Sequence, residues 1–433
     1  MERGNASFEG VVDELIAARI VYWMGGPYFA LNLRRVSRGC ARLVGVPPKI
    51  SDALKVIETA LMIGDSAACL KVLARDDDDR AELMNCAVKL AVAYDEREIL
   101  AFVFDKTRGE SLFYEHNAMG SAALAGNLNL CEFIRDCIIR SDEWKGEAAD
   151  AKRVFPFSRM MVGAARANRR DLFELGLKWS EEYAHSLPYF DESMQWAAYS
   201  GNLGICKRAR ELAIEHGQTV YVERVLQHAA WGGSVEGCKL AREWGACQFD
   251  MMLYSAAGSG SIEMCKLARG WLDATARPYS SQIFVSMMMN AIVNSKLETM
   301  RLAHEWWVAK EGRELDLDRI RYNIVMMSAE HIRMEPCKFL YSIMQQYESH
   351  NPGAETRARI IEIIDEVMKY AVLRGDTEMC EMLHSWGAVH YEMYLAFADV
   401  DDFGTKSRDA KRRTAETREL VRGWMAARDI AQR

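Results

Sequence analysis

A stretch that recurs along the chain restricts the fold more than any other feature of the sequence. Residues 229–246 read AAWGGSVEGCKLAREWGA, residues 256–271 read AAGSGSIEMCKLARGW, and residues 371–388 read AVLRGDTEMCEMLHSWGA. Small residues, a glycine, an acidic residue, a cysteine and a tryptophan follow one another in each at nearly the same spacing. A sequence with such a period predicts a stack of similar units, because one unit cannot bury its apolar surface alone.

The glycine of this stretch serves as the origin of a frame that can be traced through most of the chain. Ten copies are found, separated by 27 to 43 residues. Six origins are glycine and two are Asp95 and Asn168, residue types that accept the left-handed backbone found where a helix ends. The frame therefore predicts that a helix stops at each origin: Gly64, Asp95, Gly126, Asn168, Gly201, Gly233, Gly260, Ser295, Ile332 and Gly375.

Apolar positions on both sides of each origin predict one helix before it and one after it. The residue seven before the origin is apolar in every copy, and small or apolar residues lie three and four before it, which is helical spacing. After the origin, the fifth position is Cys in seven copies, the seventh is often Phe, Leu or Met, and the eleventh is Trp in five. Each unit is therefore predicted to be a helix pair that stacks on its neighbours.

The run AAxxGxxExCKLAREWGA resembles the ankyrin repeat, and its variants are similar to the divergent ankyrin repeats of large DNA viruses that infect protists. The resemblance covers roughly residues 50–400. The Thr-Pro-Leu-His start of that family is absent, with MMLY at Met251–Tyr254 in its place, so the hydrogen bonds that those residues make in the family's turns are not expected here. Few residues remain for a β-hairpin around Cys247–Asp250. We expect an all-α, ankyrin-like solenoid of about ten helix pairs, with little or no β-hairpin, over residues 49–400.

Residues 1–48 are predicted to form a separate helical segment before the repeats. Val11–Ile16 and Leu31–Leu43 resemble the opening and the close of an F-box, which binds the Skp1 adaptor of a cullin-RING ubiquitin ligase. The alternative is that this segment only caps the first repeat. The resemblance implies that six apolar residues divide between the adaptor-binding face and the local core: Leu15, Ile16, Ile20, Leu31, Val36 and Leu43.

The end of the chain, residues 401–433, is charged but carries apolar residues on one helical face. Its ELVRGW sequence is similar to the later half of a repeat. We expect a C-terminal capping helix, since the last repeat would otherwise expose its apolar stripe. A localisation peptide at Lys411–Arg413 is the alternative.

Charge and cysteine content limit the compartment and the kinds of partner. The net charge of −7 and pI of about 5.8 argue against a nucleic-acid partner. No stretch of about eighteen apolar residues is present, so no membrane span is expected. Seven of the eleven cysteines share one repeat position, which favours buried thiols in a reducing, cytoplasmic compartment over disulfides or metal ligands; if the protein is viral, that is the host cytoplasm.

The wide intervals between copies predict loops that gather on one edge of the stack, where variable recognition is common. Aromatic and basic residues in or beside these loops are candidates for partner binding. The alternative for each is that it folds back and fills a local gap. The candidates are Trp144, Arg153, Phe155, Tyr189, Phe190 and Trp307.

Motifs for catalysis, metal binding or a cofactor are not found in the sequence. The acidic run Asp76–Asp79 is read as a solvated turn rather than as a cation site, and neither GxxxxGK[ST] nor GxSxG occurs. We therefore expect a non-enzymatic protein–protein interaction scaffold without a cofactor. One version is a substrate adaptor that joins Skp1 to a host target; the alternative is a structural or assembly protein of a viral particle.

Overall fold

The computed structural model describes residues 57–58, 60–61, 65–74, 80–107, 113–140, 150–184, 188, 190–275, 278–313, 315–321, 334–400 and 408–431. Within these ranges the regular structure is helical and contains no strand, so the expectation of an all-α chain is confirmed. None of the helices there combines the length and the apolar character needed to cross a bilayer. The predicted adaptor-binding residues of segment 1–48 lie outside the described residues.

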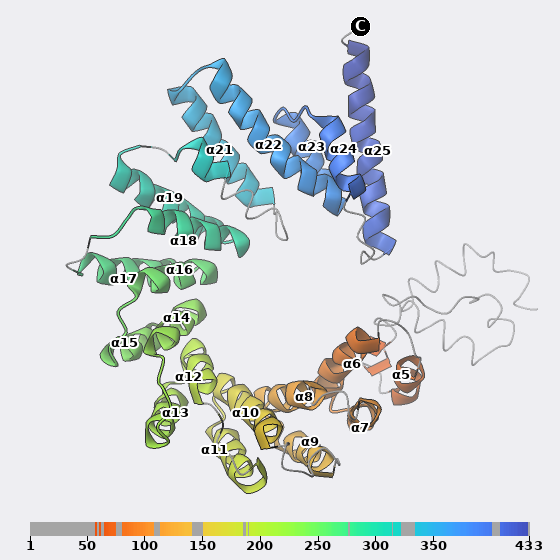
Figure 1. Ribbon diagram of the computed structural model, residues 1–433, viewed down its shortest axis with the longest axis vertical. Coiled ribbons are helices and arrows are strands. Elements are labelled where there is room, and N and C mark those ends of the chain that lie inside the picture. Colours follow the sequence, from red (N-terminus) through yellow and green to blue (C-terminus); the bar gives the residue numbers. More distant parts are fainter. Residues whose placement is uncertain are drawn as a thin grey trace, which may run out of the picture. The chain divides into compact units, whose positions relative to one another are not determined.

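The chain divides into two compact units between Val220 and Tyr221. The first unit contains α5 (Ser66–Leu73), α6 (Arg80–Tyr94), α7 (Arg97–Lys106), α8 (Phe113–Leu124), α9 (Leu128–Arg140), α10 (Asp150–Arg166), α11 (Arg170–Trp179) with the π-helix Ser180–Ala184, α12 (Phe190–Tyr199) and α13 (Leu203–Glu215). Even-numbered helices from α6 to α12 precede the origins of the frame, and each packs against the next one (Figure 1).

The second unit repeats this arrangement. It contains α14 (Val222–Gly232), α15 (Val235–Glu243), α16 (Phe249–Ser259), α17 (Ile262–Asp273), α18 (Gln282–Val293), α19 (Leu297–Glu311), α21 (Met334–His350), α22 (Ala354–Arg374), α23 (Thr377–Ser385), α24 (Tyr391–Val400) and α25 (Arg408–Ala431). The first helices α14, α16 and α18 contact one another in that order, and the second helices α17, α19 and α21 do likewise.

A left-handed residue ends the first helix of every described pair, as the sequence predicts. The eight described origins have φ between 55° and 82°, and Asp95, Asn168 and Ser295 are the non-glycine residues with positive φ in the described part of the chain. In seven of the eight described copies, the residue after the origin donates its N–H to the carbonyl of an alanine five residues earlier, at 2.7 Å for Asn202 and 2.8 Å for Ser234. This bond belongs to the Schellman motif, which satisfies a carbonyl that the helix itself leaves unpaired.

The buried residues stand at the same positions relative to the origin in each repeat. Every described residue seven before an origin is buried, and so are the seven cysteines at the fifth position after it: Cys69, Cys131, Cys206, Cys238, Cys265, Cys337 and Cys380. Burial raises the pKa of the Cys206, Cys238 and Cys265 thiols to about 12. Each described cysteine is a free thiol.

The buried stripe of the second helix differs from the predicted one. Positions four, five and eight after the origin are buried, as Met264, Cys265 and Ala268 are in α17. The seventh position was expected to be part of this stripe, and Leu240 there is buried, but Phe102, Phe133 and Phe339 are only half-buried. A period of 3.6 residues per turn places position seven at the edge of the stripe, where the aromatic rings carry cations instead.

The tryptophan at position eleven links neighbouring units through their second helices. The Arg242 guanidinium lies 4.6 Å from the ring of Trp271 in the next unit, and Arg269 lies 4.5 Å from Trp306. Arg135 makes the same contact with Trp179, between two successive repeats of the first compact unit. These cation–π stacks lie along the margin of the core, so the tryptophan is a contact between units as well as a core residue.

Two glycines allow a close approach between the first helices α8 and α10. A Cβ placed on Gly163 of α10 would lie 2.1 Å from the backbone oxygen of Gly120 in α8, and 3.0 Å from the nitrogen of Leu124. Only glycine fits there, because backbone atoms cannot move aside as a flexible side chain can.

The predicted C-terminal helix is present as α25. It packs on α22, α23 and α24, and α24 also packs on α22. Trp424 stacks on His384 of α23 with ring centroids 4.2 Å apart. α25 therefore covers α23 as a cap would, and it also pairs with α24 in the manner of a further repeat.

The left-handed turns predict that two substitutions change the free energy of unfolding in opposite directions. Replacing Ser295 with glycine should raise the free energy of unfolding by about 1 kcal/mol, because glycine adopts this φ without the Cβ penalty. The change also removes a buried hydroxyl that has no hydrogen-bond partner. The matched change Gly233→Ala should lower it by about 1 kcal/mol through backbone strain alone, since a Cβ there meets nothing within 4 Å. Urea denaturation followed by circular dichroism measures both; equal signs would contradict the turn geometry.

Candidate functional site

Exposed aromatic residues form a stripe along α14. Tyr221, immediately before the helix, and Trp231, near its end, are 50% and 46% exposed, and Arg224 and His228 lie between them at helical spacing. The Arg224 guanidinium lies 5.0 Å from the centre of the Tyr221 ring, and the rings of His228 and Trp231 are 6.2 Å apart. The stripe lies opposite the buried residues Val225, Leu226, Ala229 and Ala230.

The next two first helices extend this stripe. Met251 and Tyr254 of α16 are each 39% exposed, and Val293 of α18 is 40% exposed. Trp231 and Val293 both stand two residues before their origins, and Met251 holds the same position as Arg224. Because α14 packs on α16 and α16 packs on α18, equal positions on these three successive helices place the side chains on one surface. We call the surface formed by Tyr221, Arg224, His228, Trp231, Met251, Tyr254 and Val293 the first-helix face.

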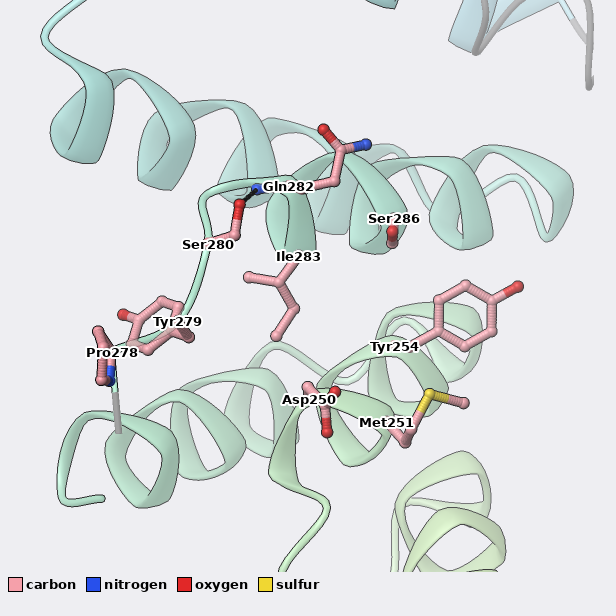
Figure 2. Close-up of a pocket in the computed structure, with 9 residues that line it drawn as sticks. All are labelled: Asp250, Met251, Tyr254, Pro278, Tyr279, Ser280, Gln282, Ile283 and Ser286. Atoms are coloured by element: carbon pink, nitrogen blue, oxygen red, sulfur yellow. Dashed lines mark hydrogen bonds between the residues drawn. The ribbon is translucent and has the colours of Figure 1, made fainter. Parts of the chain in front are cut away.

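A groove of about 560 Å³ opens beside this face, between α16 and the start of α18. Figure 2 shows Asp250, Met251 and Tyr254 on α16 across from Ile283 of α18. It is lined by Asp250, Met251, Tyr254, Pro278, Tyr279, Ser280, Gln282, Ile283 and Ser286. Its walls are thus largely apolar and aromatic, with a single carboxylate among the lining side chains.

The end of the groove formed by residues 278–282 is held by interactions with α17, with α19 and with the segment after α19. The Lys310 ammonium lies 3.5 Å from the centre of the Tyr279 ring, and the Tyr279 hydroxyl donates to Asp273. Arg319 donates to the side-chain oxygen of Gln282 at 2.7 Å. These interactions hold Tyr279 and Gln282, and they therefore position the wall formed by residues 278–282 beside α16.

Carboxylates on the first helices hold the loops that lead into the following unit. Glu223, ten residues before its origin, accepts the N–H groups of Cys247 and Gln248 at 2.9 and 3.1 Å. Asp365 holds the same position in its own unit, is 1% exposed, and accepts the N–H of Val389 at 3.1 Å. It also accepts from the Tyr394 hydroxyl and contacts His390. These carboxylates pin the turns in the absence of the Thr-Pro-Leu-His start.

Two of the predicted partner-binding residues belong to the core. Phe190, at the start of α12, is fully buried and stacks against His216, with ring centroids 6.1 Å apart. Trp307 lies inside α19 rather than in a loop, is 1% exposed, and is covered by the Arg319 guanidinium at 4.5 Å. Both are corrections: these side chains fill local gaps, which was the alternative, and they are not available to a partner.

The other predicted loop residues are not placed by the structure. Trp144 and Tyr189 lie outside the described residues, and the side chains of Arg153 and Phe155 lie outside the described part of α10. The first-helix face was missed because its residues stand at positions that vary between repeats. A signal was present, since Tyr221, Trp231 and Tyr254 occupy positions opposite the buried stripe, where polar residues are the norm.

Metal binding and similarity to known proteins add no further site. Among the described residues, no group of three or more His, Cys, Asp or Glu side chains is arranged to hold a metal ion. No protein family model matches the sequence. A comparison with curated proteins also finds no similar sequence. The class that the structure defines is an all-α protein of stacked helix pairs.

The buried carboxylate of Asp365 generates a stability prediction. Asp365→Ala should lower the free energy of unfolding by about 3 kcal/mol, because the Tyr394 hydroxyl and the Val389 amide lose their acceptor inside the protein. Thermal unfolding of the variant, of Tyr394→Phe and of the double variant measures the coupling. The double variant should lose less than the sum of the single losses, and strict additivity would show that the two side chains act independently.

Proposed function

We propose that this protein is a non-enzymatic protein–protein interaction scaffold with an ankyrin-like solenoid architecture. The observation that carries the proposal is the first-helix face, where Tyr221, Trp231, Met251, Tyr254 and Val293 are all exposed on three neighbouring helices. Trp, Tyr and Met are enriched in protein interfaces, and aromatic anchors supply much of their binding free energy. An exposed group of this kind is costly in water unless a partner covers it.

The architecture supports this use of the first helices. Small residues in the buried stripe bring these helices close together, and the left-handed turns repeat the same helix orientation from unit to unit. Equivalent positions on successive helices therefore lie side by side, which builds an extended recognition surface from a repeated element. The ankyrin-like character rests on this arrangement together with the AAxxGxxExCKLAREWGA sequence.

The test is a comparison of full-length variants in quantitative affinity purification from cells of the source organism. Trp231→Ala and Tyr254→Ala should each reduce recovery of a partner at least about tenfold, since they remove aromatic anchors. Ile430→Ala is the matched control, because Ile430 is an exposed apolar residue on α25, away from the first-helix face. A partner retained equally by all variants, or no partner enriched by the unaltered chain, would contradict the proposal.

A more specific form of the proposal makes the protein a substrate adaptor for a Skp1-cullin ubiquitin ligase. It rests on the F-box-like sequences at Val11–Ile16 and Leu31–Leu43. In this form the first segment binds Skp1 through an apolar helical surface, and the repeats select the target protein.

Binding of purified Skp1 to the full-length chain tests the adaptor form. Leu15→Asp and Val36→Asp should each abolish capture of Skp1, because a charge in an apolar interface is left without a partner. Ser37→Asp, at a polar position beside Val36, serves as the control for added charge. Absence of Skp1 binding by the unaltered chain would exclude the adaptor form and leave the interaction scaffold.

A further inference from the structure

The groove at Asp250 departs from an arrangement seen at Glu223 and Asp365, where a carboxylate on a first helix accepts backbone N–H groups of a later loop. In the unit with its origin at Gly233, Glu223 accepts two successive backbone N–H groups, those of Cys247 and Gln248, one on each carboxylate oxygen. These two residues immediately precede α16. The carboxylate therefore serves as a clamp for a short stretch of non-helical chain.

Asp250 stands at the same place in the following unit. Glu223 and Asp250 are each ten residues before an origin, and each is the second residue of its helix, α14 and α16 respectively. Asp250 is exposed, and no hydrogen bond or ion pair joins it to the described residues. The clamp is present in this unit, but its own chain does not fill it.

The length of the loop explains the difference. The interval from Gly233 to Gly260 is 27 residues, whereas that from Gly260 to Ser295 is 35. The added residues carry the chain away from Asp250, so that Ser280 lies on the far side of Ile283 (Figure 2). What remains is the groove of about 560 Å³, with Asp250 on one wall and Ile283 on the other.

We propose that this groove binds a short peptide segment of the partner protein, and that Asp250 accepts two successive backbone N–H groups of that segment. This rests on the proposed function as an interaction scaffold. The segment takes the place that Cys247 and Gln248 occupy beside Glu223. Asp250 would thus hold the bound segment in the way that Glu223 holds Cys247 and Gln248 within the protein.

The walls define the chemistry of the segment. An apolar side chain next to the clamped amides packs between Ile283 and Met251, and Tyr254 closes one end with an aromatic ring. Proline is excluded at both clamped residues, because it has no N–H to donate. Acidic residues are disfavoured beside the carboxylate, while a basic residue gains from it.

The experiment selects ligands from a random twelve-residue phage-displayed peptide library on the full-length protein. Enriched peptides should share an apolar residue and lack proline beside it. Asp250→Ala and Ile283→Asp should each weaken the binding of these synthetic peptides at least about tenfold, while Glu305→Ala, which removes an exposed carboxylate on α19, should leave it unchanged. Circular dichroism melting confirms that each variant is folded.

Backbone methylation of an enriched peptide tests the clamp directly. Methylating each amide nitrogen in turn should weaken binding at two successive positions, and those losses should disappear on the Asp250→Ala protein. Peptides that bind every variant equally, or a selection that enriches none, would overturn the proposal. A partner that depends on Trp231 but binds Asp250→Ala undiminished would overturn the groove alone and leave the scaffold function standing.

Discussion

The left-handed residue between the two helices of each pair is the constraint on which the rest of the structure depends. It ends the first helix, turns the chain, and presents the next amide to the carbonyl of a buried alanine, as Ser234 does with Ala229. Since this turn is the same from unit to unit, first helices contact first helices and second helices contact second helices. Among the described origins, Asp95, Asn168 and Ser295 maintain it without glycine. Asp and Asn tolerate this backbone, whereas Ser295 is held in it by the surrounding packing.

The contacts between units are more varied than the turns within them. Alanine and glycine bring first helices together, as Gly120 and Gly163 do, whereas cations stacked on tryptophan join the second helices. Near the C-terminus, an aromatic pair replaces the cation, with Tyr341 stacked on Trp386 at 4.1 Å. A planar side chain, either arginine or tyrosine, therefore lies on the tryptophan of the next repeat whether or not it carries a charge.

The repeats differ from one another mainly in the length of the loop that joins one repeat to the next. A short loop returns directly to the carboxylate of the preceding first helix, as at Glu223, and leaves no groove. A longer loop moves away and exposes both the carboxylate and the side of the next helix, as at Asp250. A repeat protein can thus create a binding groove by inserting residues at one junction while the helices around it keep their packing.

The sequence by itself determined the helix pairs, their ends and their buried cysteines, because these depend on local periodicity and on residues that tolerate positive φ. It could not determine that Phe190 and Trp307 are buried, since an aromatic residue near a loop can point either way, and only the neighbouring helices decide which. Nor could it place the first-helix face or the groove at Asp250. These arise where residues far apart in the sequence are brought together by stacking, and the outcome depends on how far each loop carries the chain before the next helix begins.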